Sequence, residues 1–360
     1  MTAEAPKTRP VSAVVCNYNG EAYLGACLDS LMALDPGPAE IIVVDNDSSD
    51  NSRALLERDY PEVKLIPMGR NAGPAAARNA GMRAATHPWV LALDNDVVLP
   101  AKGLGKLIAA SEAQPKAVLL QPRSVFAEEQ DRVHYDGGRL HYAGLISLRN
   151  FYRPLQEAEG SGVVVVDAVI SLCLLVNAEV VLAAGGYDER YFILFEDLDL
   201  SYRMRSAGWN LVVVEDVVCI HDAGTAGISF RDGPRYPARR VRFHSRNRWV
   251  YLTKCYGLRT LLLASPGLAL YEFAQLVFAI KQGALGAYLG GKWDFLRGLP
   301  AGWRFRREVQ RRRKVGDREL LIPGPLTLTP AVASSPAQAR LAQWLDRALC
   351  WHWRWMRLLA

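Results

Sequence analysis

The sequence predicts an α/β protein in which helices cover a mostly parallel, Rossmann-like sheet. Two observations support this prediction: short β-branched runs alternate with helical patterns through the first 100 residues, and polar residues follow those runs directly. Ligands of such sheets bind beyond the carboxyl ends of the strands. Half of the residues are hydrophobic and the six cysteines form no C-x-x-C pair, so the composition excludes global disorder and a disulfide scaffold.

The predicted elements follow one another in a regular order. Strands are expected at residues 11–16, 41–44, 63–66, 89–93, 163–166, 171–176 and 211–214. Helices are expected at residues 21–34, 50–58, 75–85 and 195–207. Residues 122–162 are richer in charge and glycine and show no clean period, so a loop-rich insertion is expected there.

Charge is unevenly distributed along the chain. Residues 231–360 carry 24 Lys or Arg against 7 Asp or Glu, a net charge of +17, whereas residues 1–230 have a net charge of −11. The acidic part is suited to hold a metal ion, and the basic part is suited to face an anionic surface. No apolar stretch opens the chain, so no secretory signal is expected, and the sparse cysteines are expected to be reduced, as in a cytosolic protein.

The basic part contains the sequence features of a membrane-associating region. Residues 261–280 reach the length of a membrane span, but Pro266 breaks the run and Glu272 adds a charge, which favours a re-entrant or in-plane helix over a span. Tryptophan and arginine interleave near the C-terminus, a pattern typical of a membrane interface. We therefore divide the chain into an α/β domain (1–230), a basic and apolar helical region (231–322), a linker (323–338) and an amphipathic helix (339–360).

An acidic motif follows the strand at residues 89–93. Asp94 and Asp96 form an Asp-x-Asp (DXD) motif, and two carboxylates in one loop can share a divalent cation such as Mg²⁺ or Mn²⁺. An isolated Asp-x-Asp is more often a solvated turn, so its companions in the sequence decide between the two interpretations.

Six segments taken together resemble family 2 glycosyltransferases with the GT-A fold. They are VVCNYNGEAYLGACLDSL, IIVVDNDSSDNS, GRNAGPAAARNAG, VLALDNDV, GGYDERYF and EDLDLSYRMRSAGW, in the order of the family and at about its spacing. The resemblance covers roughly residues 10–230. It implies that a nucleotide-sugar donor lies across the first half of the domain and that a metal bridges the donor diphosphate. The loop-rich insertion at residues 122–162 is expected to shape an acceptor cleft.

The resemblance also assigns roles to particular residues. The residues that it places at the donor are Asn17, Asp45, Arg70, Asn71, Gly73, Arg78 and Asp94, with Asn79 on the same helix. The metal ligands that it implies are Asp96, Asp94 and His221. It implies Asp197 as the general base and places Gly185, Gly186 and Glu196 on the acceptor side.

The chemistry agrees with these roles. A sugar hydroxyl needs a base to take its proton, and a departing nucleoside diphosphate needs a counter-charge. Direct displacement on the face opposite the leaving group predicts inversion. Structural interpretations stay open for several residues: Asp45 as a cap of the following turn, Glu196 as a first-turn acid, and His221 as a hydrogen-bonded core residue. Arg70 and Arg78 as surface charges also stay open.

The expected function is therefore a metal-dependent inverting glycosyltransferase of bacterial surface polysaccharide biosynthesis. The donor would be a UDP-, dTDP- or GDP-sugar and the acceptor a saccharide, with a lipid-linked form expected. Arg246, Asn247 and Arg248 add a looser resemblance to rhamnosyltransferases. The expected location is the cytoplasmic face of the inner (plasma) membrane, peripheral or monotopic, on anionic lipid; no nucleic-acid partner is expected because no recognition motif for one is present.

Two alternatives from other classes remain. A sugar nucleotidyltransferase also combines an α/β nucleotide-binding half with acidic metal ligands, but it usually has a glycine-rich basic loop where this chain has Asn17-Tyr18-Asn19-Gly20. A catalytically dead, membrane-docked glycan-binding protein is the second alternative. The intact acidic residues Asp94, Asp96 and Asp197 argue against it.

Overall fold

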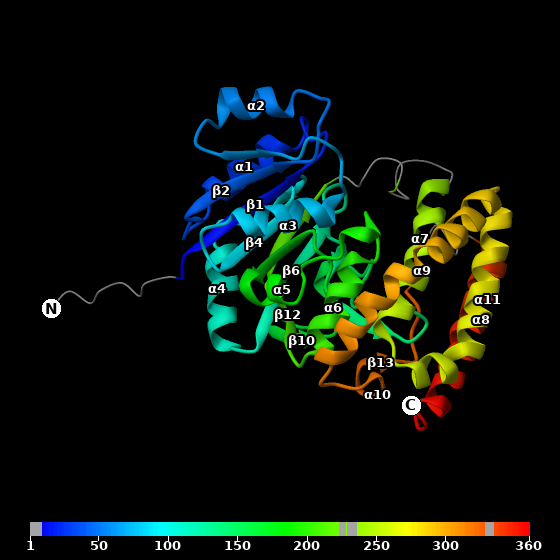
Figure 1. The fold of residues 1–360 in the computed structure, drawn as a ribbon. Helices are drawn as coiled ribbons and strands as arrows, with labels where there is room; N and C mark the ends of the chain where they lie inside the picture. The colour runs from blue at the N-terminus through cyan, green and yellow to red at the C-terminus, as the bar shows by residue number, and fades with distance from the viewer. Residues whose placement is uncertain (1–8, 223–227, 229–235, 328–334) are drawn as a thin grey trace. The chain divides into compact units, whose positions relative to one another are not determined.

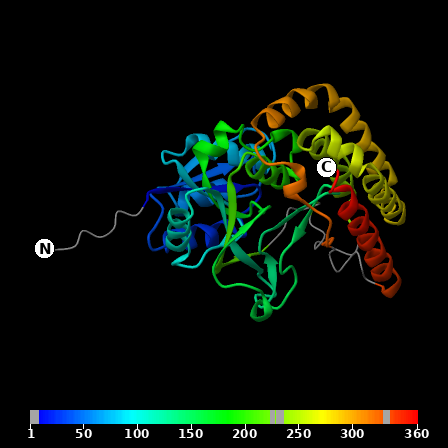
Figure 2. The ribbon, with the colours of Figure 1, turned by 90° about the horizontal axis from the view of Figure 1, so that it is seen from below.

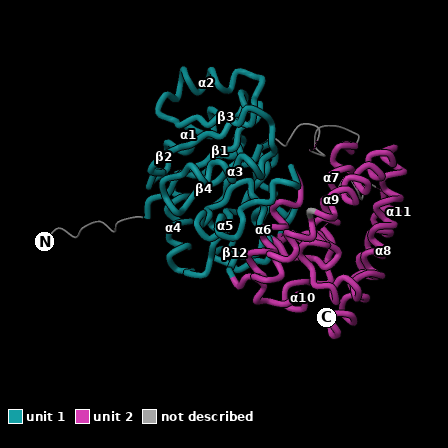
Figure 3. The backbone as a smooth tube through the Cα atoms, in the orientation of Figure 1, with its two compact units in different colours: residues 1–137, 150–192, 209–223 teal, residues 138–149, 193–208, 224–360 magenta. Residues whose placement is uncertain are grey.

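The computed structural model describes residues 9–222, 228, 236–327 and 335–360, which divide into two compact units (Figure 3). Unit 1 comprises residues 1–137, 150–192 and 209–223, and unit 2 comprises residues 138–149, 193–208 and 224–360. The division expected at residue 230 falls among residues 229–235, outside the described residues, as does part of the linker expected at 323–338. The two units differ from the expected division because residues 138–149 and 193–208 group with the C-terminal helices.

Unit 1 is built on a ten-stranded mixed sheet (Figure 1). In spatial order its main strands are β10 (Val163–Val166), β12 (Asn210–His221), β6 (Ala117–Phe126), β11 (Cys173–Asn177), β4 (Trp89–Asp94), β1 (Val11–Asn17), β2 (Glu40–Asp45) and β3 (Lys64–Pro67). Strand β5 (Val97–Val98) pairs with β12, and β7 (Val133–Tyr135) pairs with β6. Strands β4, β1, β2 and β3 run parallel, and all seven residues of β1 are buried, as expected for a strand covered on both faces.

Helices lie against this sheet and complete the core of unit 1. They are α1 (Leu24–Met32), α2 (Ser52–Asp59), α3 (Pro74–Ala84), α4 (Gly103–Ala113) and α5 (Ala178–Ala183). In α1, the helically spaced Leu24, Leu28 and Leu31 are all fully buried, so the predicted apolar stripe faces the core. Gly81 of α3 allows the helix to approach β1 closely, because a Cβ there would overlap the side chain of Val14.

The loop-rich insertion expected at residues 122–162 is interrupted by short strands that were not predicted. Strand β6 continues to Phe126, and β7, β8 (Gly138–His141) and β9 (Leu145–Leu148) follow. These last three strands are only three or four residues long, which is too short for an alternation of apolar and polar residues to be recognised in the sequence. Most of the other predicted strands and helices of unit 1 lie within a few residues of their observed bounds. Strand β12 continues to His221, well beyond the predicted end at residue 214, and β5, α4 and α5 had no predicted counterpart.

Unit 2 combines a small sheet with a set of long helices. Its three-stranded sheet has the order β13 (Leu321–Ile322), β8, β9. Its helices are α6 (Glu196–Ser206), α7 (Ala238–Cys255), α8 (Leu258–Lys281), α9 (Leu285–Arg312), α10 (Asp317–Leu320) and α11 (Pro336–Met356). Helix α9 packs against α7 and α8, and α11 packs against α8 (Figure 2).

Helix α8 is continuous, so the expected break at Pro266 is wrong. Proline has no N–H to donate to the carbonyl four residues earlier. In α8 the hydroxyl of Ser265 donates to that carbonyl, Leu262 O, at 2.8 Å, which satisfies the acceptor. Within the described residues, α8 is the one helix long and apolar enough to cross a membrane by length and composition.

The charge of Glu272 in α8 is used inside unit 2. Its carboxylate accepts hydrogen bonds from Arg248 at 2.8 Å and Trp249 at 2.7 Å, both on α7, and it also contacts Tyr288 and Lys292 of α9. One acidic side chain therefore joins three helices. Burial alone would raise the pKa of Glu272, but the two cations and the hydrogen bonds outweigh it and lower that pKa.

Candidate active site

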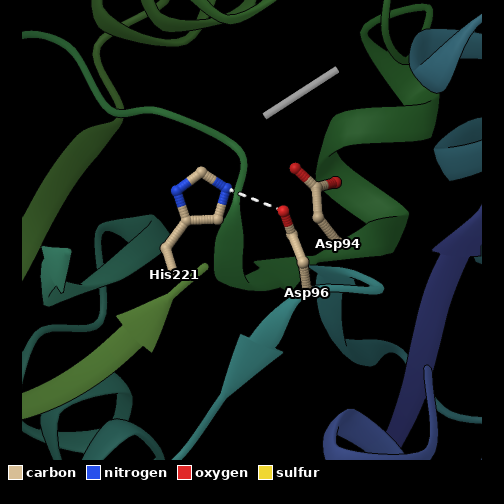
Figure 4. Close-up of side chains that lie close together, drawn as sticks. All are labelled: Asp94, Asp96 and His221. Carbon is tan, nitrogen blue, oxygen red and sulfur yellow. Dashed lines mark ion pairs between the residues drawn. The ribbon is translucent and has the colours of Figure 1, made fainter. Parts of the chain in front are cut away.

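The three predicted metal ligands lie together at the carboxyl-end edge of the sheet in unit 1 (Figure 4). Asp94 ends β4, Asp96 lies in the turn before β5, and His221 ends β12, where it pairs with Val97 of β5. One ligand atom from each of the three side chains lies within 4.8 Å of the others. His221 Nε2 is 3.4 Å from Asp96 Oδ2.

The buried guanidinium of Arg78 orients Asp94. Arg78 Nη2 donates to Asp94 Oδ1 at 2.5 Å, and the guanidinium carbon lies 5.7 Å from the centre of the Tyr187 ring. Arg78 is therefore not a solvated surface charge. Its predicted contact with a donor remains a prediction, while its contact with Asp94 is a structural fact.

The strand-end loops of β1, β2 and β4 are joined by polar side chains, of which Asn17 and Asp45 are buried. Asn17 Oδ1 accepts from Asn95 Nδ2 at 2.7 Å, and Asn17 Nδ2 donates to Ser48 Oγ at 3.1 Å. Asp45 accepts from Ser48 N at 3.0 Å and from Arg53 Nε at 3.0 Å. The carboxylate of Asp45 thus caps the turn after β2, and its predicted contact with a nucleotide base remains a prediction.

The loop before α3 is fixed by Asn71 and Gly73. Asn71 Oδ1 accepts from Asn46 Nδ2 at 3.1 Å and from Gly73 N at 3.0 Å. Gly73 has φ +86°, and a Cβ there would overlap the carbonyl oxygen of Phe192, so the position requires glycine. Arg70, in the same loop, is exposed.

The predicted acceptor-side turn is attached to α3. Gly185 and Gly186 have φ values of +96° and +65°, and a Cβ on Gly186 would lie 2.5 Å from Asn79 Oδ1. Asn79 Nδ2 donates to Tyr187 O at 2.9 Å, and Tyr187 N donates to Asn79 Oδ1 at 2.8 Å. Asn79 is therefore a buried link between α3 and this turn.

The predicted base lies in unit 2, in the first turn of α6 with Glu196 and Asp199. Asp199 is fully buried and pairs with Arg203 at 2.7 Å, as the i, i+4 spacing predicts, and with Lys254 at 2.7 Å. Glu196 is also buried, whereas Asp197 is partly exposed. Among these three acids, Asp197 is the one whose side chain reaches solvent most readily.

The backbone that leads into α6 is strained. Leu194 and Phe195 have φ values of +68° and +75°, which are unusual for bulky residues and cluster at functional sites. Asn247 of α7 donates from Nδ2 to Ile193 O and to Leu194 O, each at 2.9 Å. This amide holds the segment that presents Glu196 and Asp197.

One residue near the metal ligands was missed by the sequence analysis. His134 of β7 is buried, and its Nδ1 lies 3.0 Å from His221 Nδ1. No signal in the sequence identifies it, because it stands in the charged stretch that shows no period.

Two cysteines beside the site are unsuited to nucleophilic chemistry. Cys16, in β1, is paired in register with Asp94 of β4, and Cys27 Sγ contacts Asp94 O at 3.7 Å. Burial raises the pKa of Cys16 to about 12 and raises that of Cys27 as well. Both thiols therefore stay protonated, and a protonated thiol is a poor nucleophile.

Comparison with known proteins identifies the class of this fold and site. Residues 12–167 match the model of the family described as "Glycosyl transferase family 2". The N-acetylglucosaminyl-diphospho-decaprenol L-rhamnosyltransferase of Mycobacterium tuberculosis is 29% identical over 266 residues, covering 68% of this chain and 83% of the relative. The amylovoran biosynthesis glycosyltransferase AmsE of Erwinia amylovora is 24% identical over 238 residues, covering 65% and 84%.

The fold is also found in a solved structure. The crystal structure of GalNAc-T7 with UDP, GalNAc and Mn²⁺ aligns with a TM-score of 0.52 and 17% identity over 69% of this chain and 51% of that chain. The mixed sheet with its flanking helices is therefore a GT-A fold, and the class of the protein is glycosyltransferase. The match to the family 2 model over residues 12–167 agrees with the resemblance that the first four sequence segments carry.

Proposed function

We propose that this chain is a metal-dependent inverting glycosyltransferase that moves a sugar from a nucleotide-sugar donor to a hydroxyl of a saccharide acceptor. The observation that carries the proposal is the approach of Asp94, Asp96 and His221 to within 4.8 Å of one another at the end of a GT-A sheet. Two carboxylates and an imidazole form a donor set that fits Mn²⁺ or Mg²⁺.

Asp96, Asp94 and His221 would hold the cation. When bound, a divalent cation supplies positive charge to the diphosphate that leaves with the nucleotide. Arg78 keeps the carboxylate of Asp94 in place through the 2.5 Å hydrogen bond, so this ligand does not have to be ordered at the moment of binding. Asn17, Asp45, Arg70, Asn71 and Gly73 are proposed to contact the donor.

Asp197 is the proposed general base. Its carboxylate takes the proton of the acceptor hydroxyl while the hydroxyl oxygen bonds to the anomeric carbon and the bond from that carbon to the diphosphate oxygen breaks. Attack from the face opposite the leaving group inverts the anomeric centre. The ion pairs of Asp199 with Arg203 and Lys254 support the choice of Asp197, because they give the carboxylate of Asp199 a structural role.

The substrates are proposed from the relatives. One is named as a rhamnosyltransferase for a diphospho-decaprenol-linked sugar and another for amylovoran biosynthesis. We propose a lipid-linked saccharide acceptor in bacterial surface glycan synthesis and a UDP-, dTDP- or GDP-sugar donor. Gly185, Gly186 and Glu196 are proposed to lie on the acceptor side.

The proposed location is the cytoplasmic face of the inner membrane, peripheral or monotopic. Exposed apolar side chains of unit 2 support it, on α8 (Leu262, Phe273), α9 (Trp293, Leu296, Trp303) and α11 (Trp344, Trp351, Trp355). The net charge of +17 over residues 231–360 adds attraction to anionic lipid. The bonds of Glu272 within unit 2 favour α8 lying on the membrane over crossing it alone.

A donor screen tests the proposal. Purified full-length protein is incubated with a panel of nucleotide sugars and a lipid-linked saccharide, with Mn²⁺ or Mg²⁺, and the release of nucleoside diphosphate is measured. We expect release with one donor, dependent on acceptor and abolished by EDTA. Diphosphate release from a nucleoside triphosphate and a sugar phosphate, or turnover that EDTA leaves unchanged, would contradict the proposal.

A further inference from the structure

We propose that His134 is a positioning residue that fixes the tautomer and the orientation of His221 for metal binding. The inference rests on the metal site proposed above and adds a residue that neither the family resemblance nor the comparisons assign. Its basis is the 3.0 Å contact between the Nδ1 atoms of the two histidines.

A hydrogen bond between two Nδ1 atoms needs one donor and one acceptor, so the tautomer of one ring sets that of the other. The Nε2 side of His221 faces Asp96 Oδ2 at 3.4 Å, so a cation held with Asp96 and Asp94 uses the Nε2 lone pair. The proton of neutral His221 is then on Nδ1, and it is donated to Nδ1 of His134. Histidines that bind metals commonly donate their second N–H to a carboxylate, a backbone carbonyl or a water, which fixes the ring; here the Nδ1 of His134 takes the place of that acceptor.

The ring of His134 is itself held rigidly. It stacks on Phe126 with centroids 4.2 Å apart and on Tyr135 with centroids 3.9 Å apart, and the rings of His134 and His221 lie 4.9 Å apart and nearly parallel. His134 is 3% exposed. Because His134 is fixed by packing on two aromatic rings, it keeps the ring of His221 in one orientation. The ring then loses little conformational entropy when a cation binds.

The backbone also places His134 for this contact. Ser124 of β6 pairs with Tyr135 and the next residue, Val125, pairs with Val133, so His134 is one extra residue on β7. Such a bulge re-aims a side chain and is common beside active sites. On the other side of β6, Phe126 pairs with His221 of β12, so β6 joins the strands of both histidines.

The test is the affinity for Mn²⁺ alone, measured with full-length protein by the loss of the free-ion electron paramagnetic resonance signal. The variant His134→Phe keeps the stacked ring and removes the acceptor nitrogen, and we expect its affinity to fall by about 10- to 100-fold. The variant His134→Asn places an amide oxygen close to the lost Nδ1 and should recover part of the affinity. Unfolding temperatures without metal show whether each variant folds.

A double-mutant cycle with His221→Ala separates positioning from structure. If His134 acts through His221, then His134→Phe should cause no further loss of Mn²⁺ affinity in the His221→Ala background. Losses that add, or unchanged affinity in His134→Phe when His221→Ala is weakened, would overturn the inference and leave the metal site standing. Absence of Mn²⁺ binding by the wild-type protein would remove the proposed metal site and this inference with it.

Discussion

Arg78 Nη2 donates a hydrogen bond to Asp94 Oδ1 at 2.5 Å, which ties helix α3 to the carboxyl end of strand β4. Arg78 is buried, whereas the side chain of Asp94 is 30% exposed. The guanidinium of Arg78 therefore lies in the protein interior, and the carboxylate of Asp94 lies between it and solvent. This geometry fits an Asp94 whose orientation is fixed by Arg78 and whose solvent-facing oxygen is available to a ligand.

Replacing Arg78 should therefore cost stability as well as activity. Arg78→Met leaves the carboxylate of Asp94 without this charged donor, and we expect the free energy of unfolding to fall by about 1–3 kcal/mol. Urea unfolding measures the loss. Arg83→Met, on the exposed side of the same helix, is the matched control and should change stability by less than about 0.5 kcal/mol. Equal losses in the two variants would show that Arg78 contributes no more than a surface arginine.

Asp96→Ala should abolish turnover, because the proposed cation loses a ligand and the leaving diphosphate its counter-charge. We expect a fall in kcat of about two orders of magnitude or more, with His221→Ala less affected and needing more Mn²⁺ for half-maximal rate. Asp216→Ala, an exposed acid on β12, is the control and should keep wild-type kinetics. An Mn²⁺ titration that is the same in His221→Ala and wild type would return His221 to a structural role.

Asp197→Asn keeps the shape of the side chain and removes the proton acceptor. Turnover should fall by about 10²- to 10⁴-fold, the usual range for a general base, while the donor still binds. Asp199→Asn is the informative comparison, because it removes the charge that balances Arg203 and Lys254 and should lower the unfolding midpoint. Near-normal turnover in Asp197→Asn would move the search for the base to Glu196 or Asp199.

The sequence was sufficient for the GT-A fold and for the approach of three candidate side chains to one another. Asp94, Asp96 and His221 end strands or follow them, and parallel strand ends meet at one edge, so their approach was predictable. The ion pair of Asp199 with Arg203 followed from helical spacing in the same way.

Residues that act through tertiary contacts were not predictable. The pairing of Arg78 with Asp94 joins a helix to a strand end, and a solvated arginine gives the same sequence pattern. His134 owes its position to a bulge in a three-residue strand, which leaves no periodic signal. In helix α8, which continues through Pro266, the hydroxyl of Ser265 supplies the missing donor to Leu262 O. Helix propensities of single residues do not include such a side-chain hydrogen bond.

His141 should make the stability of the protein depend on pH. Its Nδ1 accepts from Ala143 N at 3.0 Å and its Nε2 lies 2.9 Å from Pro323 O, so the neutral ring is fully bonded, and burial lowers its pKa to about 4. Between pH 4 and the ordinary value of 6.5 the unfolded chain binds the extra proton, so stability falls as pH falls through this window. The slope should be about 1 kcal/mol per pH unit.

The variant His141→Gln tests this pH dependence. Glutamine keeps an N–H that can reach Pro323 O and does not titrate, so the variant should be less stable than wild type at pH 7 but lose less stability between pH 6.5 and 4. Urea unfolding across that range gives both slopes. Because other histidines are also buried, the informative quantity is the difference in slope between the two proteins. Parallel slopes would assign the pH dependence to other groups.

The last prediction concerns the exposed tryptophans of α11. Trp344, Trp351 and Trp355 are each more than half exposed, whereas Trp353 on the opposite face is buried, stacks on Tyr142 at 4.8 Å and donates to Leu321 O. One tryptophan of α11 therefore packs in the core of unit 2, and the three exposed ones are available to contact a membrane. We expect replacement of the three exposed tryptophans by serine to weaken binding to vesicles of anionic lipid by about tenfold or more, with the unfolding temperature unchanged.

Full-length protein is the right material for this test, because Lys254 and Asn247 of α7 bond to α6 and to the segment before it, so a truncation after Val241 would remove their support. Sedimentation with phosphatidylglycerol and with phosphatidylcholine vesicles, each at low and high salt, measures the charge contribution. Wild-type protein should pellet with the anionic vesicles at low salt and less so at high salt, because salt screens exposed charge. Trp353→Phe is the matched control, since it should lower the unfolding temperature and leave vesicle binding intact. If salt does not weaken pelleting, the result would indicate that α8 inserts into the bilayer. If the protein stays in the supernatant at low salt, the result would contradict the membrane location and favour a soluble acceptor.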